Sequence, residues 1–197
     1  MGGSFNPAHA GHVRISLLAL RLLDLDCIWW LVSPQNPLKS ERGMAPYGER
    51  LASARALARH GRIQVSEAEA RLGTRFTADT VAKLLARHPR TRFVWIMGAD
   101  NLIQIARWQR WPEIFARIPI AVFDRPTYSL KALAGQAARR FARARIGAGR
   151  ARHLATSAPP RWVFLDRARD PISATALRQS RARNPGPIRK EDVHRSA

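Results

Sequence analysis

The segment Gly2-Gly3-Ser4-Phe5-Asn6-Pro7-Ala8-His9-Ala10-Gly11-His12 decides the fold of this chain. Its paired glycines let backbone N–H groups approach a phosphate with no Cβ in the way. The apolar spacing from Val13 to Leu23 predicts a helix, and an i, i+3 spacing puts His9 and His12 on one face at its start. Because a helix N-terminus offers unpaired N–H groups and a positive dipole end, we expect an anion there. Zinc would need a third ligand at suitable spacing, and none stands out nearby, so no metal site is predicted.

Beyond this opening, short apolar runs alternate with helical patterns. The expected strands are 27–32, 63–66, 93–97, 118–123 and 162–165, and the expected helices are 49–59, 77–87 and 101–107. Strands separated by helices predict an α/β fold, a doubly wound and mostly parallel sheet with helices on both faces. Ligands of such sheets bind at the carboxyl ends of the strands, where the polar segments 33–39, 98–101 and 124–128 fall.

The length of 197 residues suits a single domain. We expect that domain to span residues 1–181, with a loosely ordered tail over 182–197 that is rich in Pro and Gly. Apolar runs are too short to cross a bilayer. The single cysteine, Cys27, excludes a disulfide framework and a cysteine metal cluster, and we interpret it as a small core side chain in a cytoplasmic protein.

The formal net charge is +20, of which residues 1–100 carry +6 and residues 101–197 carry +14. Such a charge favours nucleic acid or an anionic membrane as a partner, but charge alone identifies no ligand. Only four of the 34 basic residues are lysines. The arginine-rich segment from Lys131 to His153 is interpreted as helix with a solvated basic face.

A second anion-binding helix start is predicted near the far end of the chain. Ser173 and Thr175 are residue types that cap helices. Arg178 follows Thr175 by about one turn, so its guanidinium can reach the same anion as the hydroxyl groups.

Together, His9-Ala10-Gly11-His12 and Ile172-Ser173-Ala174-Thr175-Ala176-Leu177-Arg178 resemble the HxGH and ISxTxxR motifs of a nucleotidyltransferase superfamily. Members have a doubly wound, Rossmann-like fold and join a phosphate to a nucleoside triphosphate with release of pyrophosphate. Five further segments are similar to those of bacterial nicotinate-nucleotide adenylyltransferases: 34–39, 74–80, 97–102, Trp108 and 124–126. The resemblance extends from residue 2 to about residue 178.

This resemblance implies transfer of the adenylyl group of ATP to nicotinate mononucleotide, giving nicotinate adenine dinucleotide and pyrophosphate in NAD biosynthesis. The partners implied are ATP, with Mg²⁺ carried on it, and nicotinate mononucleotide, without a membrane or a specific nucleic acid. The catalytic residues implied are His9, His12, Lys39 and Arg178. The ATP-binding residues implied are Gly3, Ser4, Phe5, His9, His12, Gly98, Asp100, Ile172, Ser173, Thr175 and Arg178. The mononucleotide-binding residues implied are Asn36, Lys39, Thr77, Trp108, Gln109 and Arg125.

Several of these roles also have a physical basis in the residue types. A pyridine ring needs a flat partner, which Trp108 or Trp111 could supply, and the resemblance places Trp108 there. The carboxylate of nicotinate needs donors, which the resemblance assigns to backbone N–H groups near Thr77 and Gln109. Asp100 can accept hydrogen bonds from ribose or adenine, or it can cap a helix.

The sequence departs from the family pattern at two places. Met1 is followed at once by Gly2-Gly3, so the central first strand is expected to be truncated. We expect low solubility or weak activity, restored by an upstream segment of about five to eight residues. Leu38 stands where a histidine often precedes the lysine, here Lys39.

Three alternatives remain open from the sequence. One is an adenylyltransferase that acts on phosphopantetheine or nicotinamide mononucleotide, and another is a cytidylyltransferase. The third is a basic nucleic-acid-binding protein that uses the arginine-rich second half.

Overall fold

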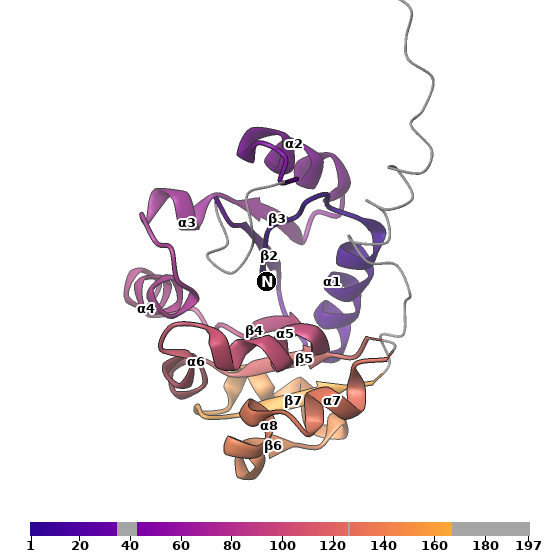
Figure 1. The fold of residues 1–197 in the computed structure, drawn as a ribbon, viewed down its shortest axis with the longest axis vertical. Coiled ribbons are helices and arrows are strands. Elements are labelled where there is room, and N and C mark those ends of the chain that lie inside the picture. Colours follow the sequence, from indigo (N-terminus) through magenta and orange to yellow (C-terminus); the bar gives the residue numbers. More distant parts are fainter. Residues whose placement is uncertain (35–42, 126, 167–197) are drawn as a thin grey trace, which may run out of the picture.

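The fold is known from a computed structural model, which describes residues 1–34, 43–125 and 127–166. Its strands form two parallel sheets with helices packed around them (Figure 1). None of the described helices is long and apolar enough to cross a membrane.

The first sheet has the order β1-β2-β3. Its strands are β1 (Gly2–Gly3), β2 (Ile28–Val32) and β3 (Ile63–Ser66). The helices of this part are α1 (Ala10–Leu22), α2 (Tyr47–Leu57) and α3 (Ala68–Arg71). All four residues from Ile28 to Leu31 pair with β3, whereas β1 pairs only with Leu31 and Val32.

The second sheet has the order β4-β5-β7-β6. Its strands are β4 (Trp95–Gly98), β5 (Ile120–Phe123), β6 (Arg145–Ile146) and β7 (Trp162–Leu165). The α-helices here are α4 (Thr77–Arg87), α5 (Ala99–Gln104), α6 (Trp111–Arg117), α7 (Ser129–Leu133) and α8 (Gln136–Arg140). Short 3₁₀ helices are η1 (Ile105–Arg107), η2 (Ala142–Ala144) and η3 (Ala148–Thr156).

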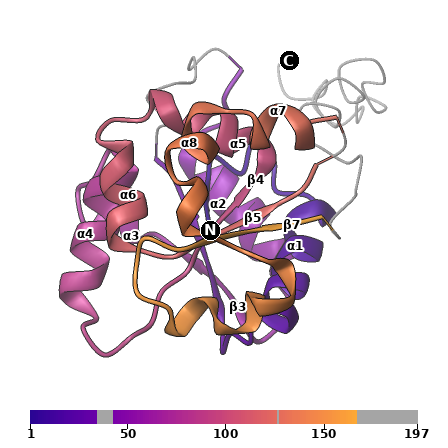
Figure 2. The same cartoon turned by 90° about the horizontal axis from the view of Figure 1, so that it is seen from below.

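The two sheets contribute to the same two core layers. Side chains alternate along each strand, so Trp95 and Met97 of β4 pack on one side while Ile96 packs on the other. In β2, Leu31 belongs to the layer of Trp95, and its neighbour Trp30 belongs to the layer of Ile96. Helices α4 and α6 cover one face and α1 covers the other (Figure 2). The predicted doubly wound α/β class is therefore confirmed.

A cavity of about 640 Å³ lies between the two sheets. Its lining includes Met1, Cys27 and Trp29 beside β2, and Phe93 and Trp95 beside β4. Both strands that border it are paired on their other side, β2 with β3 and β4 with β5. The cavity therefore separates two strands that would be close neighbours in an undivided sheet.

Most of the expected elements are present, and some match to the residue. Strands 63–66 and 162–165 and helix 77–87 have the predicted bounds. Helix α4 forms there because Ala78, Val81 and Leu84 recur on one buried face, and Pro89 lies two residues beyond its last residue.

One expectation is confirmed in part and another is wrong. The segment from Lys131 to His153 is mostly helical, but it folds as short helical turns that Gly135, Gly147 and the strand β6 separate. Arg139, Arg140 and Arg143 on these turns are nevertheless exposed, as predicted. Cys27 is exposed and not a core side chain, because it precedes β2 at the mouth of the cavity.

Candidate active site

The two predicted histidines meet at the start of α1. His9 is the residue that precedes the helix and is 5% exposed, and its ring centroid lies 3.9 Å from that of His12. Each ring also caps the helix: Nδ1 of His9 accepts from the Gly11 N–H at 3.2 Å, and Nδ1 of His12 accepts from the His9 N–H at 3.1 Å. The local sequence thus fixes both imidazoles through their own backbone.

These two bonds determine which nitrogen of each ring can donate. An Nδ1 that accepts a hydrogen bond carries no proton, so the neutral ring holds its proton on Nε2. Both histidines therefore present Nε2–H as the donor nitrogen. Donors of this kind can bind phosphate oxygens.

A stack of aromatic side chains supports His12 from beneath. The ring of Phe5 lies 4.8 Å from His12 and 5.2 Å from Trp30, measured between centroids. The Trp30 indole N–H donates to Ser16 Oγ at 2.8 Å, and Ser16 in turn donates to the His12 carbonyl at 2.8 Å. The position of His12 is therefore tied to both β2 and α1.

The turn between β1 and α1 has a left-handed residue at its centre. Phe5 has φ of 45° and its side chain is 2% exposed. Such a backbone conformation is uncommon for a residue other than glycine, so the surrounding contacts have to hold it. Gly3 precedes it in β1, where its carbonyl accepts from the Ser33 N–H at 2.9 Å.

Two polar residues of this region were not identified from the sequence as site residues. Asn6 donates to the Gly43 carbonyl at 3.1 Å and accepts from the Ala45 N–H at 3.2 Å. Arg50 is buried beneath the same turn. The sequence did not predict this burial, because a single arginine among the polar and apolar residues of a helix is normally exposed.

A second group of predicted residues lies at the carboxyl ends of β4 and β5. Arg125 Nε is 3.4 Å from Asp100 Oδ1, and both side chains are about three-quarters buried. That Asp100 oxygen accepts no hydrogen bond from the described residues. A Cβ at Gly98 would collide with Asp100 Oδ1 and lie 2.9 Å from Arg125 Nε. A side chain at position 98 would therefore displace Asp100 and Arg125 from the positions that they hold.

Trp108 and Trp111 have different environments, which distinguishes the two candidates for a stacking partner. Trp111 is 8% exposed and packs edge-on against Phe115 and Phe141 in the core. Trp108 is only half-buried at the end of η1. A partly accessible ring can stack on a ligand, so Trp108 stays the predicted stacking partner.

The backbone near Thr77 and Gln109 offers donors. Thr77 begins α4, which has no side-chain cap, and Gln109 is exposed next to Trp108. Within 1–34, 43–125 and 127–166, no hydrogen bond takes up the N–H of Thr77 or of Gln109. Both groups are thus available to an anion.

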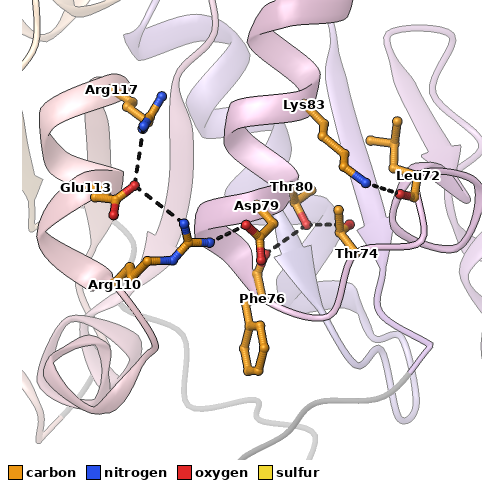
Figure 3. Close-up of polar contacts among 9 residues, drawn as sticks. All are labelled: Leu72, Thr74, Phe76, Asp79, Thr80, Lys83, Arg110, Glu113 and Arg117. Carbon is orange, nitrogen blue, oxygen red and sulfur yellow. Dashed lines mark hydrogen bonds and ion pairs between the residues drawn. The ribbon is translucent and has the colours of Figure 1, made fainter.

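An ion pair joins these two backbone segments. Asp79 in the first turn of α4 contacts the guanidinium of Arg110, and Glu113 lies 3.9 Å from the same group (Figure 3). Arg110 has φ of 51°, so the chain turns sharply between Gln109 and α6. Thr74 and Thr80, linked by hydroxyl groups 2.8 Å apart, close the turn before α4 (Figure 3). The pair is exposed, so it orients the segments more than it stabilises the fold.

Several predicted residues lie outside the described part of the chain. They are Asn36, Lys39, Ile172, Ser173, Thr175 and Arg178. Among the described residues, no three His, Cys, Asp or Glu side chains form a group that could hold a metal ion.

Comparison with known proteins identifies the family. The cytidylyltransferase-like family model matches residues 1–180. A probable nicotinate-nucleotide adenylyltransferase of Cereibacter sphaeroides is 54% identical over 178 residues, covering 90% of this chain and 94% of that protein. One of Parvibaculum lavamentivorans, also named probable, is 52% identical over 179 residues, covering 91% of this chain and 89% of that protein.

A solved structure is similar in fold. It is the Plasmodium falciparum nicotinic acid mononucleotide adenylyltransferase complexed with NaAD, with a TM-score of 0.66 and 16% identity, covering 90% of this chain and 80% of that one. At this identity the likeness concerns the fold alone. Taken with the family match over residues 1–180, the histidine pair and the parallel sheets lead to one conclusion: this chain belongs to the cytidylyltransferase-like family of nucleotidyltransferases.

Proposed function

We propose that this chain transfers the adenylyl group of ATP to nicotinate mononucleotide, in the cytoplasm, and so forms nicotinate adenine dinucleotide and pyrophosphate. The observation that carries the proposal is the His9–His12 pair, whose Nδ1 atoms are occupied by backbone N–H groups so that both Nε2 atoms are donors. The names of the relatives that are about half identical to the chain support the same reaction.

The chemistry is an in-line displacement at the α-phosphorus of ATP. A phosphate oxygen of the mononucleotide forms the new P–O bond, and the bond to the β-phosphate oxygen breaks, so that pyrophosphate leaves with its electron pair. No protein nucleophile is needed, and the protein positions the reactants and neutralises developing charge. His9 and His12 would donate to the α-phosphate oxygens as that charge grows.

The other described site residues would bind the two substrates. Asp100, whose Oδ1 accepts no hydrogen bond from the described residues, would accept from the adenosine part of ATP, beside Gly98. Trp108 would stack on the pyridine ring, while the N–H groups of Thr77 and Gln109 bind its carboxylate. Arg125 would hold phosphate, and Gly3, Ser4 and Phe5 would form the phosphate-binding turn.

The assignments to residues outside the described part of the chain, and that of the metal ion, rest on the sequence and on the resemblance. Lys39 and Asn36 would bind the mononucleotide. Ser173, Thr175 and Arg178, with Ile172, would hold the leaving pyrophosphate. Mg²⁺ would arrive on the triphosphate, where phosphate oxygens and water supply most of its ligands.

The test of the reaction is pyrophosphate release from ATP with each of three acceptors. Nicotinate mononucleotide is expected to be the best acceptor, with nicotinamide mononucleotide and phosphopantetheine far slower. A faster rate with either of the others would reassign the substrate. Binding to DNA that falls steeply with salt and is indifferent to ATP would instead favour the nucleic-acid alternative.

Substitutions at His12 test the mechanism. We expect His12→Ala to lower turnover by a factor of about a hundred. Because His12 Nδ1 also accepts the His9 N–H, His12→Asn is the sharper variant, since its carbonyl can keep that bond while the Nε2 donor is lost. His60→Ala, at an exposed histidine, is the matched control. Near-normal turnover of His12→Asn would remove His12 from the mechanism.

A further inference from the structure

Arg50 is a buried arginine with no acidic partner among the described residues. It lies in the first turns of α2, beside the first sheet (Figure 1), and is 2% exposed. Its nitrogens donate to four backbone carbonyl groups: Ala45 at 3.0 Å, and Ser4, Ser33 and Pro34 at 2.7 Å each. Three segments distant in sequence thus converge on one guanidinium.

This arrangement is unusual energetically. Burial lowers the pKa of Arg50, although an arginine stays charged at neutral pH. A buried charge without a counter-ion is costly and needs compensation from dipoles. The dipoles of four carbonyl groups supply that compensation. Because carbonyl groups are neutral, the net positive charge of Arg50 remains under the turn that precedes α1. This charge would attract an anion bound at that turn.

One of the four bonds determines the direction of a peptide group in the turn. The carbonyl of Ser4 points at Arg50, and a trans peptide holds its N–H antiparallel to its carbonyl. The N–H of Phe5 therefore points away from Arg50. No described residue accepts a hydrogen bond from this N–H. Phe5 itself is held in its left-handed conformation, and its ring supports His12.

We propose that Arg50 is a positioning residue for the phosphate-binding turn. By holding the Ser4 carbonyl, it directs the Phe5 N–H toward the triphosphate and keeps the Phe5 ring under His12. Its bonds to Ser33 and Pro34 fix the end of β2 relative to the same turn. Arg50 does not touch the substrate in this account, and the inference rests on the proposed assignment of the turn to ATP.

The first experiment compares Arg50→Lys with Arg55→Lys. A lysine keeps the charge but has a single nitrogen, which cannot reach all four carbonyl groups that the Nε, Nη1 and Nη2 atoms of Arg50 reach. Arg55 is the matched control, because it lies on the same helix in an exposed ion pair with Glu67 at 2.6 Å. Melting temperature and circular dichroism are recorded for both variants.

We expect Arg50→Lys to lower kcat/KM for ATP by about a hundredfold, while KM for nicotinate mononucleotide stays within about threefold. Arg55→Lys should change neither value. Unchanged kcat/KM for ATP in Arg50→Lys would overturn the proposal. A fall in both substrates' constants that only follows the loss of folded protein would also overturn it, because a purely structural role predicts that pattern.

Two further measurements separate Arg50 from the identity of the acceptor. The dissociation constant of a non-hydrolysable ATP analogue, measured without any acceptor, should rise about tenfold in Arg50→Lys. In Arg50→Ala, added guanidinium at low millimolar concentration should recover at least about tenfold of the lost activity, and Arg55→Ala should not respond. If no acceptor supports turnover in the unmodified chain, the reaction assignment fails, and the analogue-binding result still decides the role of Arg50.

Discussion

The two sheets of this molecule are built from similar apolar strands but are held together differently. In the second sheet, all four residues of β5 pair with β4 on one side and with β7 on the other. In the first sheet, β2 pairs fully with β3, but its other side meets only the two residues of β1. The unpaired length of β2 borders the cavity of about 640 Å³ that separates it from β4.

This difference affects how each half of the site is positioned. Gly98, Asp100 and Arg125 extend directly from β4 and β5, which are fixed by strand pairing. The turn that leads to His9 follows a two-residue strand and depends on side-chain bonds from Arg50 and Asn6. Side-chain hydrogen bonds thus position the first half of the site, whereas strand pairing positions the second half. The two halves should therefore also differ in stability.

Amide exchange should give the largest difference. Backbone N–H groups of a parallel strand point alternately to its two sides. The N–H of Ile28 donates to the carbonyl of Arg62, which directly precedes β3, and the N–H of Leu31 donates on the opposite side to the carbonyl of Met1. The N–H of Trp29 therefore faces the cavity. We expect it to exchange about a thousandfold faster than the N–H of Ala121 in the doubly paired β5. Similar protection of the two amides, measured by NMR, would mean that β2 is as well covered as β5.

Filling the cavity with a strand should give the next largest effect. We expect an extended apolar segment of about five to eight residues, joined to Met1, to pair with the edge of β2 that borders the cavity. Each added residue would extend the chain by about 3.3 Å along β2. A gain of about 3 kcal/mol would raise the melting temperature by roughly 6–12 °C, and turnover should rise with it.

The matched control for the added segment has the same length but carries proline at alternate positions. Proline cannot donate to a strand ladder, so this version should give no stabilisation. Equal melting temperatures for the two extended chains would contradict strand pairing in the cavity.

The fold was more predictable from sequence than the site. Strands such as 162–165 are short apolar runs buried on both faces, and helix 77–87 has one strongly apolar face, so both could be recognised locally. The gap between β2 and β4 lies beside the two-residue strand β1, whose truncation the comparison with the family pattern indicated and periodicity alone does not report. The Lys131–His153 segment was predicted as helix because its alanines and arginines favour helix, while Gly135, Gly147 and the strand β6 divide it into short helical turns.

Within the site, the sequence predicted residues that have a motif and missed those that act by burial. His9 and His12 are three residues apart beside a glycine turn, a pattern visible without a structure. Arg50 has no motif around it, and its role arises from four carbonyl groups in three separate segments. The use of Nδ1 of each histidine for capping could not be predicted either, because it depends on ring orientation.

Alanine in place of two glycines should show how firmly each half of the molecule holds the side chains around it. A Cβ at Gly98 would meet the ends of the Asp100 and Arg125 side chains, which are about one-quarter exposed and can move. A Cβ at Gly2 would lie 2.9 Å from the buried Trp95 ring, which would have to shift as a whole into the cavity that it borders. We expect Gly2→Ala to lower the free energy of unfolding by about 1–2 kcal/mol and Gly98→Ala by under about 1 kcal/mol.

Denaturant unfolding measures both variants, with Gly61→Ala as control because no atom lies within 4 Å of its added Cβ. Equal losses at positions 2 and 98 would show that the Asp100 and Arg125 side chains are held as rigidly as the Trp95 ring.

The last expected effect is a pH dependence that arises at the cavity. The Met1 ammonium donates to the Trp29 carbonyl at 2.8 Å, and burial lowers the pKa of this amine from 8.0 to about 5. Between pH 5 and 8 the unfolded amine binds a proton that the folded amine does not, so the free energy of unfolding should rise with pH. The slope is at most about 1.4 kcal/mol per pH unit.

The nearby Glu69 acts in the opposite sense and has to be separated from the amine. Burial raises the pKa of its carboxyl group, so its contribution to stability falls as pH rises above the ordinary glutamate range. Acetylation of the Met1 amine removes one titration and leaves Glu69 in place, while the amide N–H can still donate to Trp29. The difference in slope between free and acetylated chains over pH 6–8 therefore reports the buried amine together with its charge interaction with Glu69. Identical slopes would mean that water reaches the amine through the cavity, and that the gap between the sheets is solvated rather than closed around Met1.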